Sequence, residues 1–124
     1  MSARWFAAGA IAAGLAVILG AFGAHGLQGR VAPDLLAAYE TGARYHLAHA
    51  LALLAVGLAA GRRNNSLTTT AGWLFLAGIA VFSGSLYLMT LTGARWLGAI
   101  TPIGGLAFIL GWIALAAGVL RGVR

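Results

Sequence analysis

Residues 5–26 read WFAAGAIAAGLAVILGAFGAHG, a run that contains no Asp, Glu, Lys or Arg. Arg4 precedes the run, and Arg30 is the first charged residue after it. A helix needs about 20 apolar residues to cross the hydrocarbon core of a bilayer. A cleavable signal peptide is the alternative, but its apolar region is shorter, about 7–15 residues, and the small residues here form a poor cleavage pattern. The run therefore predicts a transmembrane helix over about residues 5–27.

Three further apolar runs follow along the chain. The helix of the second is expected to begin at Pro33, because proline suits a first helical turn and Asp34 favours the positive end of a helix. Its first residues are predicted to lie on the membrane surface. Thr101 and Pro102 are predicted as the cap and first turn of the last helix. The sequence thus predicts an all-α, four-helix transmembrane bundle with spans of about 5–27, 42–61, 71–93 and 101–120, an interfacial helix from about 33, and a polar loop over 62–70.

Composition supports one membrane domain over residues 1–124. Of the 124 residues, 61% are hydrophobic and 8% are charged, whereas soluble domains carry about 25% charged residues. The net charge of +6 is compatible with nucleic-acid binding in principle, but the eight basic residues are all arginines and lie between the apolar runs. Such binding requires basic residues on one face. We therefore expect the lipid bilayer, and no nucleic acid, as a partner. The absence of cysteine excludes disulfides and thiolate ligands.

The arginines also predict an orientation. In a four-span protein the N-terminus, the second loop and the C-terminus lie on one side of the membrane. Cytoplasmic segments carry an excess of Lys and Arg. The opposite side has fewer arginines and both acidic residues, Asp34 and Glu40. We expect both termini in the cytoplasm, on the side of Arg4, Arg62, Arg63, Arg121 and Arg124.

Polar side chains within the spans gather toward the outer side. A rise of 1.5 Å per residue and a core of about 30 Å put His46 and His49 roughly 6 and 10 Å below the outer edge. The inner half of the bundle is almost purely apolar. Ionisable groups inside spans are candidates for function. The candidate site in the outer third comprises His25, Glu40, Arg44, His46, His49, Ser83, Tyr87 and Thr101.

Helical phase predicts which residues of this site share a face. At 100° per residue, one stripe of the second helix is expected to pack against protein and another to carry Glu40 and Arg44. The i,i+4 spacing, acid first, predicts an ion pair between these two. Alternatively, Arg44 binds an anionic lipid or solute. The packed stripe is Gly42, His46, His49, Leu53 and Gly57, and a face of the third helix is Ala80, Ser83, Tyr87 and Thr90.

The histidines allow several interpretations. Each imidazole could hydrogen-bond a neighbouring helix, as polar side chains do in membrane bundles. They could instead bind a metal ion, since i,i+3 spacing can present two imidazoles to one ion, or ligate haem iron. A proton relay is a further possibility. No carboxylate lies on the face of the second helix that carries His46 and His49. The leading interpretation includes no cofactor, and a metal or haem site of His25, His46 and His49 is the alternative.

Glycine occurs 19 times and in every span. Several pairs of small residues lie four positions apart, a spacing that lets helix backbones approach closely. Four short helices enclose little space alone, so we expect a homo-oligomer or an accessory to a larger complex. The pairs are Gly57–Gly61, Ala16–Gly20–Ala24 and Ala114–Gly118.

Four sequence blocks resemble a known family. The blocks are GAFGAHGL (20–27), YETGARYHLAHAL (39–51), FSGSLYL (82–88) and GAITPIGGLAFILGW (98–112). Together they resemble the small four-span bacterial membrane proteins known as domain of unknown function 423, the YgdD/YwdK-like family, to which the eukaryotic transmembrane protein 256 is similar. The resemblance implies a multi-pass protein of the bacterial inner membrane. It implies no catalytic residues.

We therefore predict a non-enzymatic integral membrane protein. Its polar cluster would be structural or would bind a lipid or small solute. The alternatives are a haem- or metal-binding protein and a minimal transporter that works as an oligomer.

Overall fold

The structure, a computed structural model, describes residues 2–60 and 66–122, and these residues form four long helical rods. The first rod is α1 (Ala3–Phe22), continued by the π-helical turn η1 (Gly23–Leu27), and the second is α2 (Pro33–Ala60). The third comprises α3 (Ser66–Gly78), the π-helical η2 (Ile79–Ser83) and α4 (Gly84–Thr92). The fourth comprises the 3₁₀ turn η3 (Arg95–Ala99) and α5 (Thr101–Gly122). The predicted all-α fold of four long apolar helices is confirmed.

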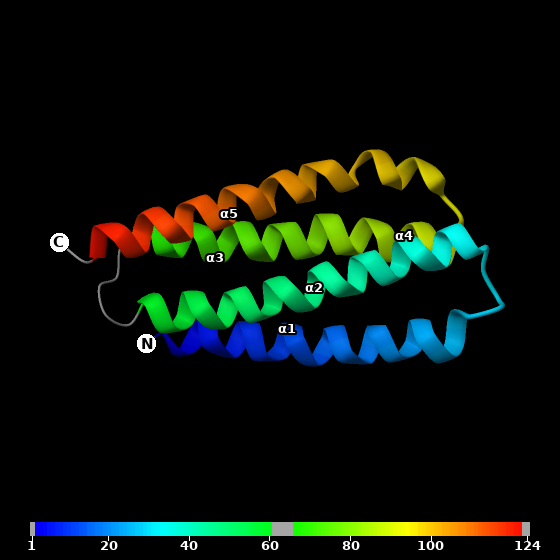
Figure 1. Cartoon of the computed structure of the whole chain (residues 1–124), viewed down its shortest axis with the longest axis horizontal. Coiled ribbons are helices and arrows are strands. Elements are labelled where there is room, and N and C mark those ends of the chain that lie inside the picture. The colour runs from blue at the N-terminus through cyan, green and yellow to red at the C-terminus, as the bar shows by residue number, and fades with distance from the viewer. Residues whose placement is uncertain (1, 61–65, 123–124) are drawn as a thin grey trace.

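The four rods lie side by side, and the start of α1 and the end of α5 are at the same end of the bundle (Figure 1). α1 packs along α2, α2 packs on α3, η2 and α4, and α3 and η2 pack on α5. By contrast, α2 and α5 touch at few positions. Successive rods therefore pack tightly against each other, whereas the seam between α2 and α5 is looser.

The polar segment before the third span is helical rather than a loop. The loop prediction was wrong for Ser66–Thr70, because α3 begins at Ser66, while residues 61–65 lie outside the described part of the chain. Thr68 is buried. The Thr70 hydroxyl donates to the carbonyl of Ser66 at 2.7 Å, one turn back. A hydroxyl bonded in this way is satisfied within the helix and needs no water as a partner.

Glycines make the contact between α1 and α2 very close. A Cβ on Gly57 would stand 2.7 Å from the backbone nitrogen of Phe6, and one on Gly9 would stand 2.8 Å from the backbone of α2. Gly57, predicted for close helix packing, therefore packs against α1 of the same chain. Gly61, the other small residue of its pattern, lies outside the described residues. In the α1 pattern, Ala16 is buried but Gly20 has open space beside it.

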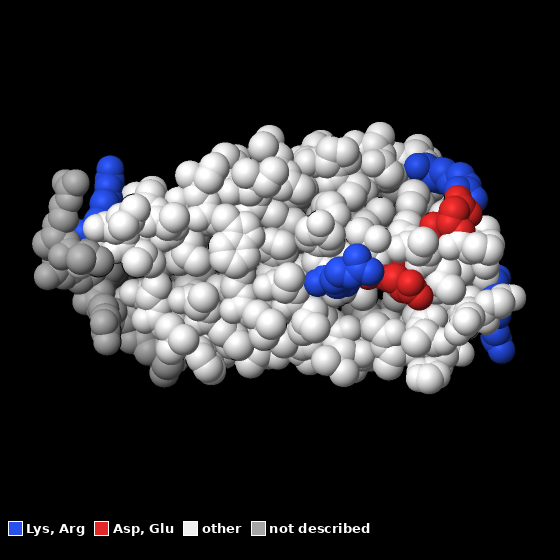
Figure 2. All heavy atoms as spheres, in the orientation of Figure 1, with Lys and Arg blue, Asp and Glu red and all other residues white. Residues whose placement is uncertain are grey.

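Large apolar side chains face outward along all four rods. The exposed ones include Ile11, Leu51, Trp73 and Ile103. Figure 2 shows a broad uncharged surface, with charged side chains toward the two ends and a basic group beside an acidic group between them. Such a surface suits hydrocarbon rather than water, which agrees with four helices long and apolar enough to cross a membrane.

Candidate functional site

The buried face of α2 lies at the centre of the site. Gly42, His46, His49 and Leu53 are all buried on it, as the helical phase predicts. His46 and His49 are 4% and 5% exposed. α2 is a regular helix over its whole length, so positions three and four apart line up on one side. This face brings both imidazoles into the bundle and turns Glu40 and Arg44 outward.

His46 joins α2 to α4. Its Nδ1 lies 2.9 Å from the hydroxyl oxygen of Tyr87. The Tyr87 ring also packs on Tyr39, with centroids 4.8 Å apart. Two predicted site residues, His46 and Tyr87, are thus brought together, and the imidazole connects α2 to α4.

Tyr39 fixes the C-terminal end of α1 against α2. Its hydroxyl donates to the carbonyl of Leu19 at 2.7 Å, and its ring is 1% exposed. Gly23 gives the ring its space, because a Cβ there would stand 2.5 Å from a ring carbon of Tyr39. Sequence reasoning missed Tyr39. Its position three residues before Gly42 and in phase with His46 was the available signal.

Hydroxyl groups tie the remaining helices together. Ser83 donates to the carbonyl of Gly42 at 2.7 Å, which connects η2 to α2. Thr90 donates to the carbonyl of Leu35 at 2.9 Å, which connects α4 to the start of α2. α5 begins at Thr101, where the sequence predicted its start, directly after the turn η3. The Thr101 hydroxyl meets that of Ser85 at 2.6 Å instead of capping α5.

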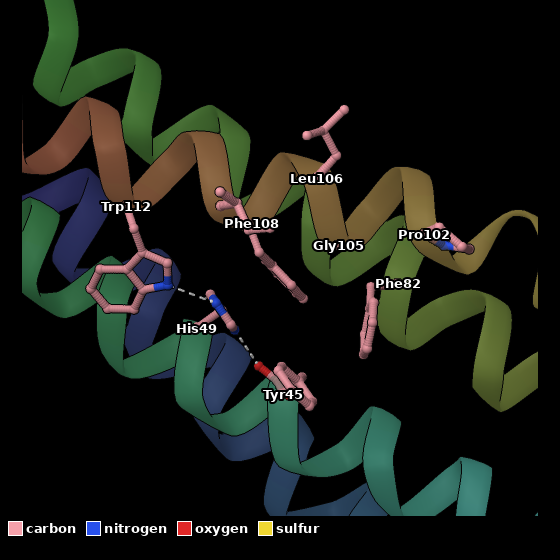
Figure 3. Close-up of a pocket in the computed structure, with 9 residues that line it drawn as sticks. Tyr45, His49, Phe82, Pro102, Gly105, Leu106, Phe108 and Trp112 are labelled. Atoms are coloured by element: carbon pink, nitrogen blue, oxygen red, sulfur yellow. Dashed lines mark hydrogen bonds between the residues drawn. The ribbon is translucent and has the colours of Figure 1, made fainter.

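His49 joins α2 to α5 across the seam. Its Nδ1 lies 2.7 Å from the carbonyl oxygen of Tyr45, which can only accept, so Nδ1 carries the proton. Its Nε2 accepts from the indole N–H of Trp112 at 3.0 Å. The ring stacks on Phe108 with centroids 3.6 Å apart. Figure 3 shows the imidazole between Tyr45 and Trp112. Both nitrogens of a neutral imidazole are therefore satisfied.

Three predicted site residues lie on the surface of the bundle. His25, Glu40 and Arg44 are exposed. The predicted ion pair of Glu40 with Arg44 does not form between these two exposed residues. Between described residues the one ion pair is that of Arg95 with Asp34, which links the start of η3 to the start of α2 and was not predicted.

The structure does not bring the three histidines together. His25 lies exposed in η1, His46 faces Tyr87 and His49 faces Trp112. Over residues 2–60 and 66–122 no group of three His, Cys, Asp or Glu side chains could hold a metal ion. The alternative metal site of His25, His46 and His49 therefore lacks its geometry.

A pocket opens at the seam between α2 and α5. Its volume is about 590 Å³. Figure 3 shows side chains of α5 on one side and Tyr45 and His49 of α2 on the other. Its walls are aromatic and aliphatic apart from the Tyr45 hydroxyl and the occupied nitrogens of His49 and Trp112. The lining residues are Tyr45, His49, Phe82, Pro102, Gly105, Leu106, Phe108, Ile109 and Trp112.

A second, smaller groove lies on the other side of α2. It has a volume of about 390 Å³ and lies between α1 and the third rod. His46 is its one polar lining residue, and the other lining residues are Ala8, Ile11, Ala12, Leu15, Leu76, Ile79 and Ala80. The two histidines, three positions apart, thus border different grooves.

Comparison with known proteins identifies the family. A family described as "Protein of unknown function (DUF423)" matches residues 19–105. The UPF0382 membrane protein YwdK of Bacillus subtilis is 50% identical over 114 residues, which is 91% of this chain and 93% of the relative. A UPF0382 membrane protein of Staphylococcus aureus is 50% identical over 107 residues, 86% of this chain and 87% of the relative. No solved structure matches the chain. The chain, with four helices able to span a bilayer, therefore belongs to the DUF423/UPF0382 family of bacterial multi-pass membrane proteins.

Proposed function

We propose that this protein is a non-enzymatic membrane protein that holds the hydrocarbon chain of a lipid, or of a similar long apolar molecule, in the pocket between α2 and α5. The observation that supports this most directly is the apolar lining of that pocket, about 590 Å³ in volume, within two helices of membrane-spanning length. Ligand sites of this size are typically apolar with few polar groups. The solvent around such a seam is itself hydrocarbon.

The state of the polar cluster supports an apolar rather than a polar ligand. Within residues 2–60 and 66–122, every buried side-chain nitrogen or oxygen has a hydrogen-bond partner. His46, His49, Ser83 and Thr101 use their polar atoms to join helices. Groups that are already hydrogen-bonded within the bundle cannot bind a polar solute unless those hydrogen bonds first break. This pairing supports a structural role for the cluster.

The same pairing supports a non-enzymatic role. Proton transfer requires an acid or base within reach of a substrate. In the pocket the ionisable side chains are His49 and Tyr45. The Nδ1 proton of His49 is held by the carbonyl of Tyr45, and its Nε2 already accepts from the N–H of Trp112. The Tyr45 phenol is then a weak acid that has no base beside it among the described residues.

The shape of the pocket suits an extended chain. Along α5 the lining runs from Pro102 to Trp112, which at 1.5 Å per residue is about 15 Å. Pro102, Gly105, Ile109 and Trp112 are spaced three or four residues apart and form one stripe. This stripe runs parallel to the helices, as lipid chains do in a bilayer.

Filling the pocket should displace the bound chain. We expect Gly105→Leu to lower several-fold the lipid retained by protein purified in mild detergent. Gly105 lines the pocket, and a Cβ there meets the Phe82 ring only at 3.7 Å, so the added side chain has room but occupies the space of the ligand. Mass spectrometry of the native protein measures the retained lipid.

Gly14→Leu is the matched control. It adds the same side chain on α1, where a Cβ has no atom within 4 Å, and should leave lipid retention unchanged. Equal retention by both variants and the unchanged protein, or no retained lipid in any of them, would contradict the proposed function.

For the orientation we propose an inner-membrane protein with both termini in the cytoplasm. The arginine distribution supports this, and so does the placement of the start of α1 and the end of α5 at one end of the bundle. The chain has no cysteine, so single cysteines can be introduced at Ser2 and at the exposed Gln28. A membrane-impermeant thiol reagent applied to intact cells should label Gln28→Cys but not Ser2→Cys, and the reverse pattern would invert the topology.

We further propose that the protein works as a homo-oligomer or within a larger membrane complex. One copy offers two shallow grooves rather than an enclosed path. On α1, a Cβ added to Gly20 would have no atom within 4 Å, and such small residues favour helix association. Native mass spectrometry in bilayer nanodiscs tests this, because a strictly monomeric mass with no co-purified protein would contradict it.

A further inference from the structure

Arg44 and the hydroxyl of Tyr45 have no role in the packing of the bundle. Both residues are exposed on α2. Within residues 2–60 and 66–122 neither the guanidinium nor the phenol oxygen has a hydrogen-bond or ion-pair partner, although the ring of Tyr45 packs against Phe82 at 4.9 Å. An arginine on the lipid-facing side of a membrane helix is unfavourable unless it finds a partner at the membrane surface. Arg44 and the Tyr45 hydroxyl therefore form a pair that is available to bind a partner outside the chain.

The length of α2 gives the depth of this pair. The helix has 28 residues, about 42 Å, whereas the hydrocarbon core takes only about 20 residues or 30 Å. The polar sequence after Ala60 places the inner membrane edge near the end of α2. Counting back about 20 residues reaches residue 41. Arg44 then lies about one turn below the outer edge, where its flexible side chain reaches the phosphate level.

The pair also lies at the outer end of the pocket. Tyr45 lines the pocket, and Arg44 precedes it in the helix. His49, deeper along α2, and Trp112, deeper along α5, continue the lining toward the membrane interior. A molecule whose apolar chain fills the pocket would therefore carry its polar end at the level of Arg44 and Tyr45. This placement suits an amphiphile that stands upright in the outer leaflet.

We propose that Arg44 and the Tyr45 hydroxyl bind the phosphate of an anionic membrane lipid whose chain occupies the pocket between α2 and α5. This rests on the proposed function and adds the class of the head group. Arg binds phosphate through a planar set of donors, and the phenol adds one more. Glu40 lies one turn closer to water, about 6 Å along the axis, and disfavours a second negative charge there. The site thus favours a head group with a single phosphodiester charge.

The test compares lipids that share their chains but differ in the head group. The full-length protein in nanodiscs or mild detergent is titrated with phosphatidylglycerol, phosphatidylcholine and diacylglycerol, and bound lipid is counted by native mass spectrometry. We expect phosphatidylglycerol to be preferred about fivefold over phosphatidylcholine, the factor that one basic residue at a membrane surface supplies. Arg44→Gln should abolish this preference, and Tyr45→Phe should reduce it.

Arg30→Gln is the matched control, because Arg30 is also exposed near the outer end but does not border the pocket. It should retain the preference. Equal binding of all three lipids by the unchanged protein, with binding still lost in Gly105→Leu, would overturn the head-group proposal while the pocket stands. If Gly105→Leu retains as much lipid as the unchanged protein, the proposed function itself is overturned. Arg44-dependent binding of inorganic phosphate without a chain would show a soluble anion as the ligand, and would also overturn the proposal.

Discussion

Replacement of Gly104 by alanine is expected to destabilise the bundle by about 1–3 kcal/mol, the usual range for overfilling a packed site. A Cβ on Gly104 would stand 2.3 Å from the backbone nitrogen of Phe82 and 2.7 Å from its Cα. Both atoms belong to the main chain of η2, which cannot rotate aside as a side chain can. The added methyl group must therefore push α5 away from the third rod. Unfolding by detergent titration, followed by tryptophan fluorescence, measures the loss.

Gly105→Ala is the control, since it lies next to Gly104 in the same helix. Its Cβ would meet the Phe82 ring at 3.7 and 3.8 Å, which is ordinary contact. Both substitutions share the gain in helix propensity of about 1 kcal/mol that alanine has over glycine. Gly105→Ala should therefore be neutral or slightly stabilising. If the two variants unfold alike, the close approach of α5 to η2 does not exist.

The sequence predicts the α2 face well because α2 is regular. Gly42, His46, His49 and Leu53 follow from a constant 100° per residue, and all four are buried. The same arithmetic fails on the third rod, where Ala80 was assigned to one face with Ser83. The π-helical η2 lies between Gly78 and Gly84, and Ala80 is exposed while Ser83 is buried. The wider π-helical turn shifts the phase, and nothing in the local sequence marks it.

Contacts between distant segments could not be predicted. Asp34 and Arg95 are 61 positions apart, and their pairing depends on how the start of α2 meets the turn η3. The predicted Glu40–Arg44 pair used only spacing within one helix, and such exposed pairs are weak. Trp112 is a similar case. It lies near the middle of an apolar span, and only the packing of α5 beside α2 brings its N–H to His49.

The second large effect is expected from His49→Ala, at about 2–4 kcal/mol of lost stability. The imidazole is 5% exposed and stacks on Phe108 at 3.6 Å. Its removal leaves a cavity and also leaves the Trp112 N–H without its acceptor. The seam between α2 and α5 has few other contacts, so little else there compensates. His25→Ala, which alters an exposed imidazole in η1, should have no measurable effect.

Trp112→Phe separates the hydrogen bond from the packing. It keeps an aromatic ring near the pocket but removes the indole N–H, and should lower stability by about 0.5–1.5 kcal/mol. If the bond joins the helices as the geometry indicates, the His49→Ala and Trp112→Phe effects will not add, and a double-mutant cycle will give a coupling of about 0.5–1 kcal/mol. Additive effects would show that the imidazole acts through packing alone. A metal or haem that co-purifies with the unchanged protein and is lost in His49→Ala would contradict the structural role, because it would require Nε2 to leave Trp112 and bind the iron or metal ion instead.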